Sequence, residues 1–168
     1  MALPPAPSPF LIRFPSPLGR LEVLSDGEAV TGLAIEAAGR LPHDAREESP
    51  NRVLERARAQ LEKYFAGSSA TLSVPLALRG TPFQLAIWNR LRELRHGETL
   101  SYGTLGAAAG VPGAGRAVAA AIRSNPIPLL VPCHRVLTSE GTVTGWSHGP
   151  GIEAKLWLLK HEAVVLAA

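Results

Sequence analysis

Short apolar stretches separated by turn residues run through the first half of the chain. Residues 36–50 are polar and predict a loop. Over residues 50–65 the apolar positions have helical spacing, and this segment is preceded by Ser49-Pro50 and followed by Gly67. The stretches rich in Val, Ile, Leu and Phe are 10–14 (FLIRF), 20–24 (RLEVL), 30–35 (VTGLAI) and 71–78 (TLSVPLAL). They predict four strands of a small antiparallel sheet, accompanied by one helix.

The second half has the pattern of short helices. Thr81-Pro82-Phe83-Gln84 is a capping-box sequence with proline at the first helical position, and it predicts a helix start. A last helix is expected at about 152–161, with Ile152, Leu156 and Leu159 on one face. Together with the first half, these helices predict an α+β protein. Its predicted domains are residues 1–79, with a loose leader at 1–8, and residues 80–168.

Two of these helices lie close together along the chain. Ser101 is expected to cap a helix over 102–109, Gly110-Val111-Pro112 ends it, and the alanine-rich residues 113–123 predict the next. Two short helices joined by a tight turn are a helix-turn-helix candidate, although such pairs are more often packed helices without a DNA-binding role. Three prolines then make 125–132 an extended loop that leads to Cys133.

Composition and charge narrow the class of protein. With 168 residues, 46% of them hydrophobic, the chain is not disordered as a whole. The longest apolar run is only six residues, 117–122, and the start of the chain lacks the features of a signal peptide. A single cysteine excludes an internal disulfide. Residues 81–168 hold 8 basic and 5 acidic residues, which permits a polyanionic partner without requiring one. We therefore expect a soluble protein inside the cell.

Cys133 is the candidate for chemistry. A lone cysteine is usually a buried small hydrophobic residue. Here, however, it follows a proline-rich loop and precedes His134 and Arg135, and a neighbouring His and positive charge favour the reactive thiolate. Adjacent side chains on an extended chain point in opposite directions, so water would bridge Cys133 and His134. Arg135 and Arg123 are expected to contact phosphate or to pair with acids.

Pro132-Cys133-His134-Arg135-Val136, preceded by Asn125-Pro126-Ile127-Pro128, resembles the active-site signature of the O6-alkylguanine-DNA alkyltransferases. Three other segments resemble the family in the same order: 80–106 (GTPFQLAIWNRLRELRHGETLSYGTLG), 115–118 (GRAV) and 155–162 (KLWLLKHE). The resemblance is specific over residues 80–162 and rests on strand order over 10–78. It implies a ribonuclease H-like N-terminal domain and a C-terminal domain that binds double-stranded DNA and accepts the alkyl group.

The resemblance also implies roles for individual residues. Cys133 would accept the alkyl group, His134 would be its base through water, Glu162 would orient His134, and Asn125 would brace the active-site loop. Tyr102 would help to rotate the target nucleotide and donate to the guanine ring, and Arg116 would replace the flipped base in the stack. The residues that would face DNA are Ala117, Ala119 and Arg123. The base pocket would be formed by Pro128, Val136, Trp146 and Ser147. In this pocket the carbonyls of Cys133 and Val136 would accept from the guanine amine, and the Ser147 amide would face O6.

The implied function is single-turnover transfer of an alkyl group from O6-alkylguanine, and also from O4-alkylthymine, to Cys133 after base flipping. No cofactor and no metal are expected, and the protein would be a cytoplasmic monomer, nucleoid-associated in a prokaryote or nuclear in a eukaryote. The alternatives are a lesion sensor that binds without transfer, a helix-turn-helix regulator and a Cys–His hydrolase.

The chain departs from the family pattern at two places near the expected site. Residues 146–151 (WSHGPG) replace Tyr-x-Gly-Gly and make the link to the last helix about two residues longer. Ala119-Ala120 stands where the family has Gly-Gly. The first departure predicts that the rim of the base pocket is reshaped. The second predicts that DNA lies slightly farther from the protein at Ala119-Ala120.

Overall fold

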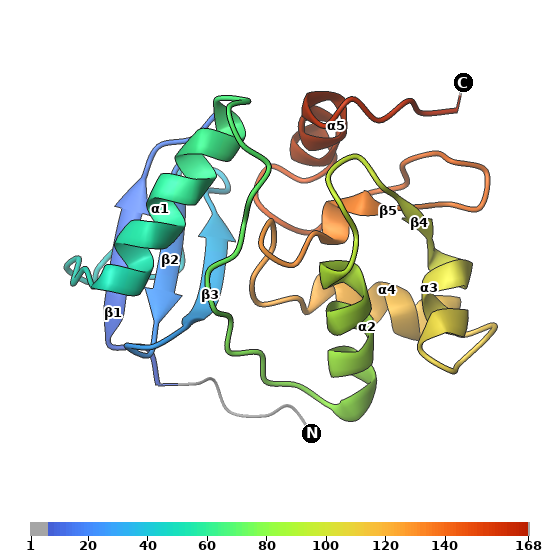
Figure 1. Cartoon of the computed structure of the whole chain (residues 1–168), viewed down its shortest axis with the longest axis horizontal. Helices are drawn as coiled ribbons and strands as arrows, with labels where there is room; N and C mark the ends of the chain where they lie inside the picture. Colours follow the sequence, from blue (N-terminus) through green and yellow to red (C-terminus); the bar gives the residue numbers. More distant parts are fainter. Residues whose placement is uncertain (1–6, 168) are drawn as a thin grey trace. The chain divides into compact units, whose positions relative to one another are not determined.

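The structure, a computed structural model, describes residues 7–167. The predicted leader at residues 1–8 therefore lies mostly outside the described residues. The chain divides into two compact units, one ending at Arg79 and one beginning at Gly80 (Figure 1). Among the described helices, none has both the length and the apolar character needed to cross a membrane.

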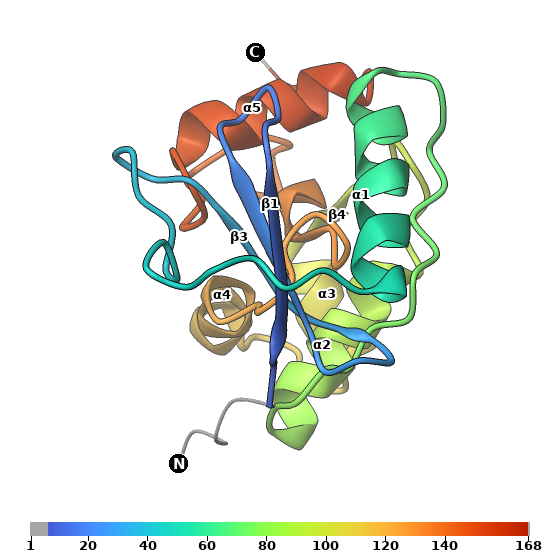
Figure 2. The same ribbon diagram turned by 90° about the vertical axis from the view of Figure 1, so that its left-hand side faces the viewer.

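The first unit is built on a three-stranded antiparallel sheet (Figure 2). Its strands are β1 (Phe10–Phe14), β2 (Leu21–Ser25) and β3 (Val30–Ile35), paired in the order β1-β2-β3. Val23 of the central strand lies opposite Ile12 on one side and Leu33 on the other. These cross-strand apolar residues are buried, so a one-residue slip in register would expose them. The α+β class predicted from the sequence is confirmed.

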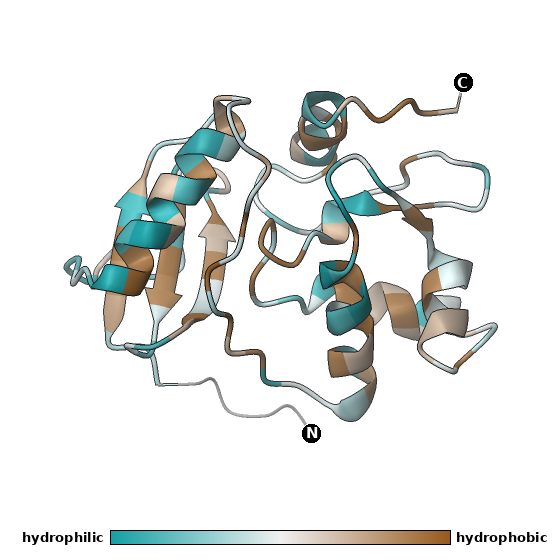
Figure 3. Ribbon diagram, viewed as in Figure 1, coloured by the Kyte–Doolittle hydropathy of each residue, from teal (hydrophilic) through white to brown (hydrophobic). Residues whose placement is uncertain are grey.

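Helix α1 (Arg52–Phe65) packs on this sheet, as the helical spacing of its apolar residues predicts. The Asn51 side chain caps it by accepting from the backbone N–H of Leu54 at 2.9 Å. Polar residues cover the other side of the helix (Figure 3). The buried residues of α1 are Leu54, Ala57, Leu61 and Tyr64.

The prediction of a fourth strand at residues 71–78 is wrong, because this segment does not form a regular strand. The segment makes only an isolated parallel bridge between Leu76 and Val30 of β3. The Val30 N–H donates to the Pro75 carbonyl at 2.9 Å, and the Ala77 N–H donates to the Val30 carbonyl at 2.9 Å. Pro75 has no N–H with which to extend the ladder, so the pairing stops there.

The second unit is mainly helical. Thr81 and Gln84 form the predicted capping box at the start of the first helix. The unit also contains a two-stranded parallel ladder, a long loop and a short 3-10 turn. In chain order the elements are α2 (Pro82–Arg92), β4 (Leu100–Ser101), α3 (Tyr102–Ala108), α4 (Gly115–Arg123), η1 (Cys133–Arg135), β5 (Val136–Leu137) and α5 (Ile152–His161).

Helices α3 and α4 pack against each other and against α2, as a helix-turn-helix requires. A Cβ on Gly106 would lie 3.1 Å from the Val111 carbonyl oxygen and 3.1 Å from a Val118 methyl group, so glycine permits this close approach. The Trp88 indole donates to the Ala121 carbonyl at 2.9 Å and joins α2 to α4. Helix α4 begins at 115 rather than at the predicted 113 because Gly113 has a φ of +78°, outside the helical region.

The apolar face that the sequence predicts for α5 is only partly buried. Leu159 is buried, but Ile152 and Leu156 are 42% and 40% exposed. The face that points inward instead carries Ala154, Lys155 and Leu158. Lys155 is buried because its ammonium group finds carbonyl acceptors inside the unit, which an apolar pattern cannot indicate.

Candidate active site

Cys133 lies at the start of η1, at the end of the loop that leaves α4. Asn125 holds this loop from within: its side-chain amide donates to the Val131 carbonyl at 2.9 Å, and its side-chain oxygen accepts from the Ile127 N–H at 3.0 Å. Asn125 is itself only 4% exposed. The Asn125 side chain therefore joins both ends of segment 127–131, which precedes the cysteine.

The Cys133 thiol is fully buried. Burial raises the pKa of the thiol because a thiolate is poorly solvated there, while contacts with Asn125 and Trp146 and the nearby charge of Lys155 act in the opposite direction. The Trp146 indole N–H donates to Sγ with a nitrogen-to-sulfur distance of 3.3 Å. The surroundings thus combine a low-polarity site with specific groups that favour the thiolate.

His134 and Glu162 form a buried pair. Nε2 of His134 lies 2.7 Å from a carboxylate oxygen of Glu162, although 28 residues separate them in the sequence. Burial lowers the pKa of His134 and so favours the neutral ring. With Nε2 donating to the carboxylate, Nδ1 is the ring nitrogen that can accept a proton. Nδ1 is also buried and has no hydrogen-bond partner among the described residues.

Arg135 completes this cluster through an ion pair. Its guanidinium donates to both oxygens of Glu162, at 2.7 and 3.1 Å, and to the Leu94 carbonyl at 3.0 Å. Of the two expectations for Arg135, pairing with an acid is confirmed. Since Arg135 is only 6% exposed, it does not serve as a surface phosphate contact.

Lys155 is a site residue that the sequence reasoning missed. Its ammonium group donates to the Val136 carbonyl at 2.6 Å and lies 3.4 Å from the Gly145 carbonyl. Burial lowers the pKa of Lys155 to about 8, whereas the charge of Cys133 acts to raise it. The signal that could have found it is its spacing of seven residues from Glu162, which places both near one face of α5.

A pocket of about 650 Å³ opens in the second unit beside α3 and α4. Of the predicted base-pocket residues, Trp146 and Ser147 line it, and so do Tyr102, Ala119 and Arg123. Pro128 and Val136 are buried and are not among its lining residues. The remaining lining residues are Gly103, Gly115, Ile122, Thr138, Ser139, Glu140, Thr144 and Gly145.

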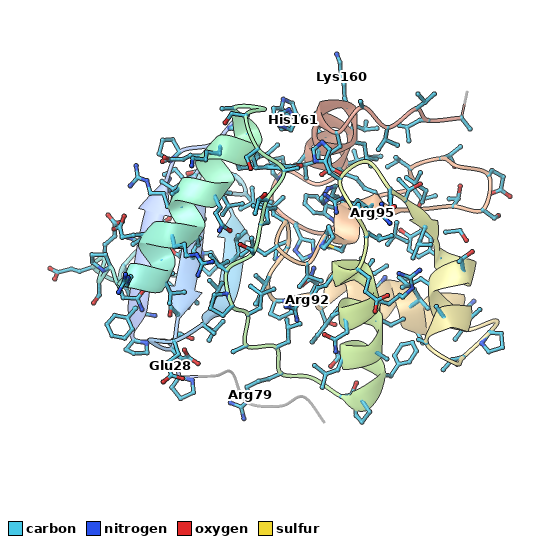
Figure 4. The ribbon with its side chains drawn as sticks, in the orientation of Figure 1. Glu28, Arg79, Arg92, Arg95, Lys160 and His161 are labelled. Atoms are coloured by element: carbon cyan, nitrogen blue, oxygen red, sulfur yellow. The ribbon has the colours of Figure 1, made fainter. Side chains whose placement is uncertain are left out.

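Of the residues predicted to contact DNA, Tyr102 begins α3 and the others lie on α4. Arg116, Ala117 and Arg123 are exposed and Ala119 is half-buried. Neither arginine makes a hydrogen bond or ion pair with another described residue. Positive charge is not confined to this helix, because Arg92 and Arg95 lie at and after the end of α2 and Lys160 points outward from α5 (Figure 4).

The other histidines do not form one cluster, although His148 packs against a residue of the site. His43 lies in the first unit, where Nδ1 is 2.7 Å from Glu22. His148 packs edge-on against Trp146 with ring centroids 5.0 Å apart, and His161 stacks on Trp157. Within residues 7–167, no group of three or more His, Cys, Asp and Glu side chains could hold a metal ion.

Comparison with known protein families gives two matches that together span most of the chain. Residues 82–164 match the model of the DNA-binding domain of 6-O-methylguanine DNA methyltransferase. Residues 12–78 match the model of the ribonuclease-like domain of the same family. The two matched segments fall on either side of the boundary between the two compact units.

Individual relatives agree with these matches. The methylated-DNA–protein-cysteine methyltransferase of Haemophilus influenzae is 43% identical over 155 residues, which cover 90% of this chain and 84% of that protein. The constitutive enzyme of that name from Bacillus subtilis is 37% identical and covers 89% and 92%. The crystal structure of Mycobacterium tuberculosis OGT in complex with DNA superposes with a TM-score of 0.80 at 38% identity, covering 92% of this chain and 93% of that one. The chain therefore belongs to the 6-O-methylguanine DNA methyltransferase family.

Proposed function

We propose that this protein repairs O6-alkylguanine in duplex DNA by moving the alkyl group irreversibly onto Cys133. The observation that carries the proposal is the buried thiol of Cys133 beside the His134–Glu162 pair, in the unit that also holds the helix-turn-helix and the pocket. A nucleophile, a base and a group that orients the base are the parts that nucleophilic catalysis needs.

The chemistry balances with these groups alone. The thiol proton passes through water to Nδ1 of His134, and the thiolate attacks the alkyl carbon. The carbon–sulfur bond forms as the carbon–O6 bond breaks, and O6 leaves with the electron pair. Donors to the ring and to O6, which we assign to Tyr102 and the Ser147 amide, stabilise the developing charge. The departing guanine takes up one proton on its ring, which balances the proton that His134 has taken from the thiol, and the carbonyls of Cys133 and Val136 accept from its amine.

The lesion must leave the base stack before the buried sulfur can reach it. Extrusion of a base costs a few kcal/mol, less for a poorly paired one. We propose that Tyr102 crowds the DNA backbone and that Arg116 fills the gap in the stack. We also propose that Ala117, Ala119 and Arg123 of α4 face the DNA.

The thioether product is not readily hydrolysed, so each molecule is expected to react once. The same geometry extends to O4-alkylthymine, in which the alkyl group also sits on an exocyclic oxygen. The protein is expected to act as a monomer and without a cofactor.

Intact-mass measurement tests this function. The protein is incubated with a duplex containing one O6-methylguanine and, as the control, with the same duplex containing guanine. We expect a gain of one methyl group in place of one hydrogen, with the lesion only, reaching at most one per molecule. Binding of the lesion duplex without a change of mass would instead identify a lesion sensor.

Arg116→Ala is expected to slow transfer from duplex DNA by about 30-fold, because the loss of roughly 2 kcal/mol of support for the flipped state raises the barrier by that amount. Reaction with free O6-methylguanine base needs no flipping and should be unchanged. Single-turnover rates on the two substrates measure this difference. The matched control is Arg123→Ala at the other end of α4, which should mainly weaken DNA affinity and its salt dependence. Equal slowing of Arg116→Ala on both substrates would remove the proposed role.

A further inference from the structure

Trp146 touches the reacting atom as well as the pocket. Its indole N–H lies on Sγ of Cys133, with 3.3 Å between nitrogen and sulfur, while the residue also lines the pocket beside Ser147. Two interactions hold the segment around it. The Gly145 carbonyl faces the Lys155 ammonium at 3.4 Å, and the Gly151 N–H donates to the His148 carbonyl at 2.9 Å.

The indole ring is also packed on two sides. The His148 ring lies edge-on to it with centroids 5.0 Å apart, and His148 in turn makes a long hydrogen bond of 3.4 Å to the Ile122 carbonyl. The His134 ring is edge-on at 6.3 Å. These contacts restrict the rotation of the indole and keep the N–H directed at the sulfur.

An indole N–H can donate but cannot accept. A neutral thiol sulfur is a weak acceptor, whereas a thiolate accepts a stronger, charge-assisted hydrogen bond. A donor fixed on Sγ therefore stabilises the charged form more than the neutral one. In a fully buried site, which bulk water does not solvate, the difference is largest.

We propose that Trp146 is a catalytic residue that activates Cys133 by donating its indole N–H to the thiolate. The proposal rests on the proposed role of Cys133 as the alkyl acceptor. It adds a hydrogen-bond donor to the sulfur, which the His134–Glu162 side-chain pair does not provide. The other ionisable groups near the sulfur are Lys155 of α5 and His134, with the Arg135–Glu162 ion pair behind His134. A substitution at Trp146 leaves the chemical identity of all these groups unchanged.

NMR titration tests the proposal without any DNA. Because the chain has one cysteine, ¹³Cβ-labelled cysteine gives one resonance whose shift with pH reports the Cys133 pKa. Trp146→Phe keeps an aromatic ring and removes the N–H, and we expect it to raise the thiol pKa by about one, a tenfold loss of thiolate at a given pH below the pKa. The pH profile of the transfer rate should move upward by the same amount.

The indole resonances give an independent signature. In the unchanged protein, the Trp146 N–H is expected to shift with the same pKa as the cysteine carbon. The Trp88 N–H, which donates to the Ala121 carbonyl, should not shift. Trp157→Phe is the matched control variant, since it makes the same substitution at another half-buried tryptophan, and it should leave the thiol pKa unchanged.

Replacement of Trp146 by 3-benzothienylalanine, which has the shape of tryptophan without the N–H, covers the case in which Trp146→Phe fails to fold. An unchanged thiol pKa in either variant, or a Trp146 indole that does not follow the titration, would overturn the proposal. Since these measurements need no lesion, they also separate it from the proposed function. If the protein gains no mass with O6-methylguanine DNA, the proposed function fails. Whether the Trp146 N–H and the Cys133 carbon titrate together can still be measured in that case.

Discussion

Cys133→Ser is expected to abolish the gain of mass on incubation with O6-methylguanine duplex. The serine hydroxyl ionises far less readily than a thiol, and the buried site provides only His134, a base whose pKa burial lowers further. The oxygen therefore remains protonated and is a poor nucleophile toward carbon. Intact mass after prolonged incubation with excess lesion duplex measures the result.

DNA binding should survive this substitution, because the residues assigned to DNA contact lie on α3 and α4 rather than in η1. Cys133→Ala serves as the control, since it removes the nucleophile and introduces no hydroxyl group. Both variants should bind the lesion duplex with nearly the affinity of the unchanged protein in a mobility-shift assay. A methylated product of Cys133→Ser would place the acceptor on another residue.

Glu162→Gln is expected to reduce both stability and transfer. The Glu162 side chain is fully buried and accepts from both His134 and Arg135. An amide has one oxygen and one NH₂ group, so one of these donors would face another donor, and the buried guanidinium would lose its counter-charge. Breaking a buried ion pair costs about 3 kcal/mol. His134 would also lose the partner that fixes its tautomer, for which we expect roughly a 100-fold slower transfer.

Chemical denaturation and single-turnover kinetics measure these two effects of Glu162→Gln. Glu93→Gln is the matched control, because it makes the same substitution in an exposed ion pair with Arg90, where the Glu93 side chain is 68% exposed. Exposed pairs contribute at most about 1 kcal/mol, so this variant should behave like the unchanged protein. If Glu162→Gln retains the normal transfer rate, Glu162 does not act through His134.

Local signals along the chain predicted most of the secondary structure. The capping box at Thr81, the cap at Ser101 and the helical spacing of 50–65 depend on residues within one or two turns of each other, and each marks a helix that the structure contains. The prediction failed at 71–78, where strand-like composition did not lead to regular pairing. Pairing depends on a distant partner and on the N–H that Pro75 lacks.

Some residues of the site could likewise be predicted from the sequence, and others could not. Cys133, His134, Arg116 and Tyr102 could be named from sequence, because they belong to contiguous segments that resemble a known family. Residue order also indicated Glu162 and Asn125 through that resemblance. Lys155 was missed, because its burial depends on the Val136 and Gly145 carbonyls that the fold brings to it.

The sequence by itself determined the α+β class, the two-part division of the chain and the single thiol available for chemistry, since these follow from composition, periodicity and contiguous motifs. Only the tertiary structure decided that Arg135 pairs with Glu162 rather than with phosphate, that Nδ1 of His134 is the ring nitrogen without a partner, and that the Trp146 indole donates to the sulfur. The physical reason is that hydrogen bonds and ion pairs of buried groups join residues far apart in the chain, and their partners are chosen by packing.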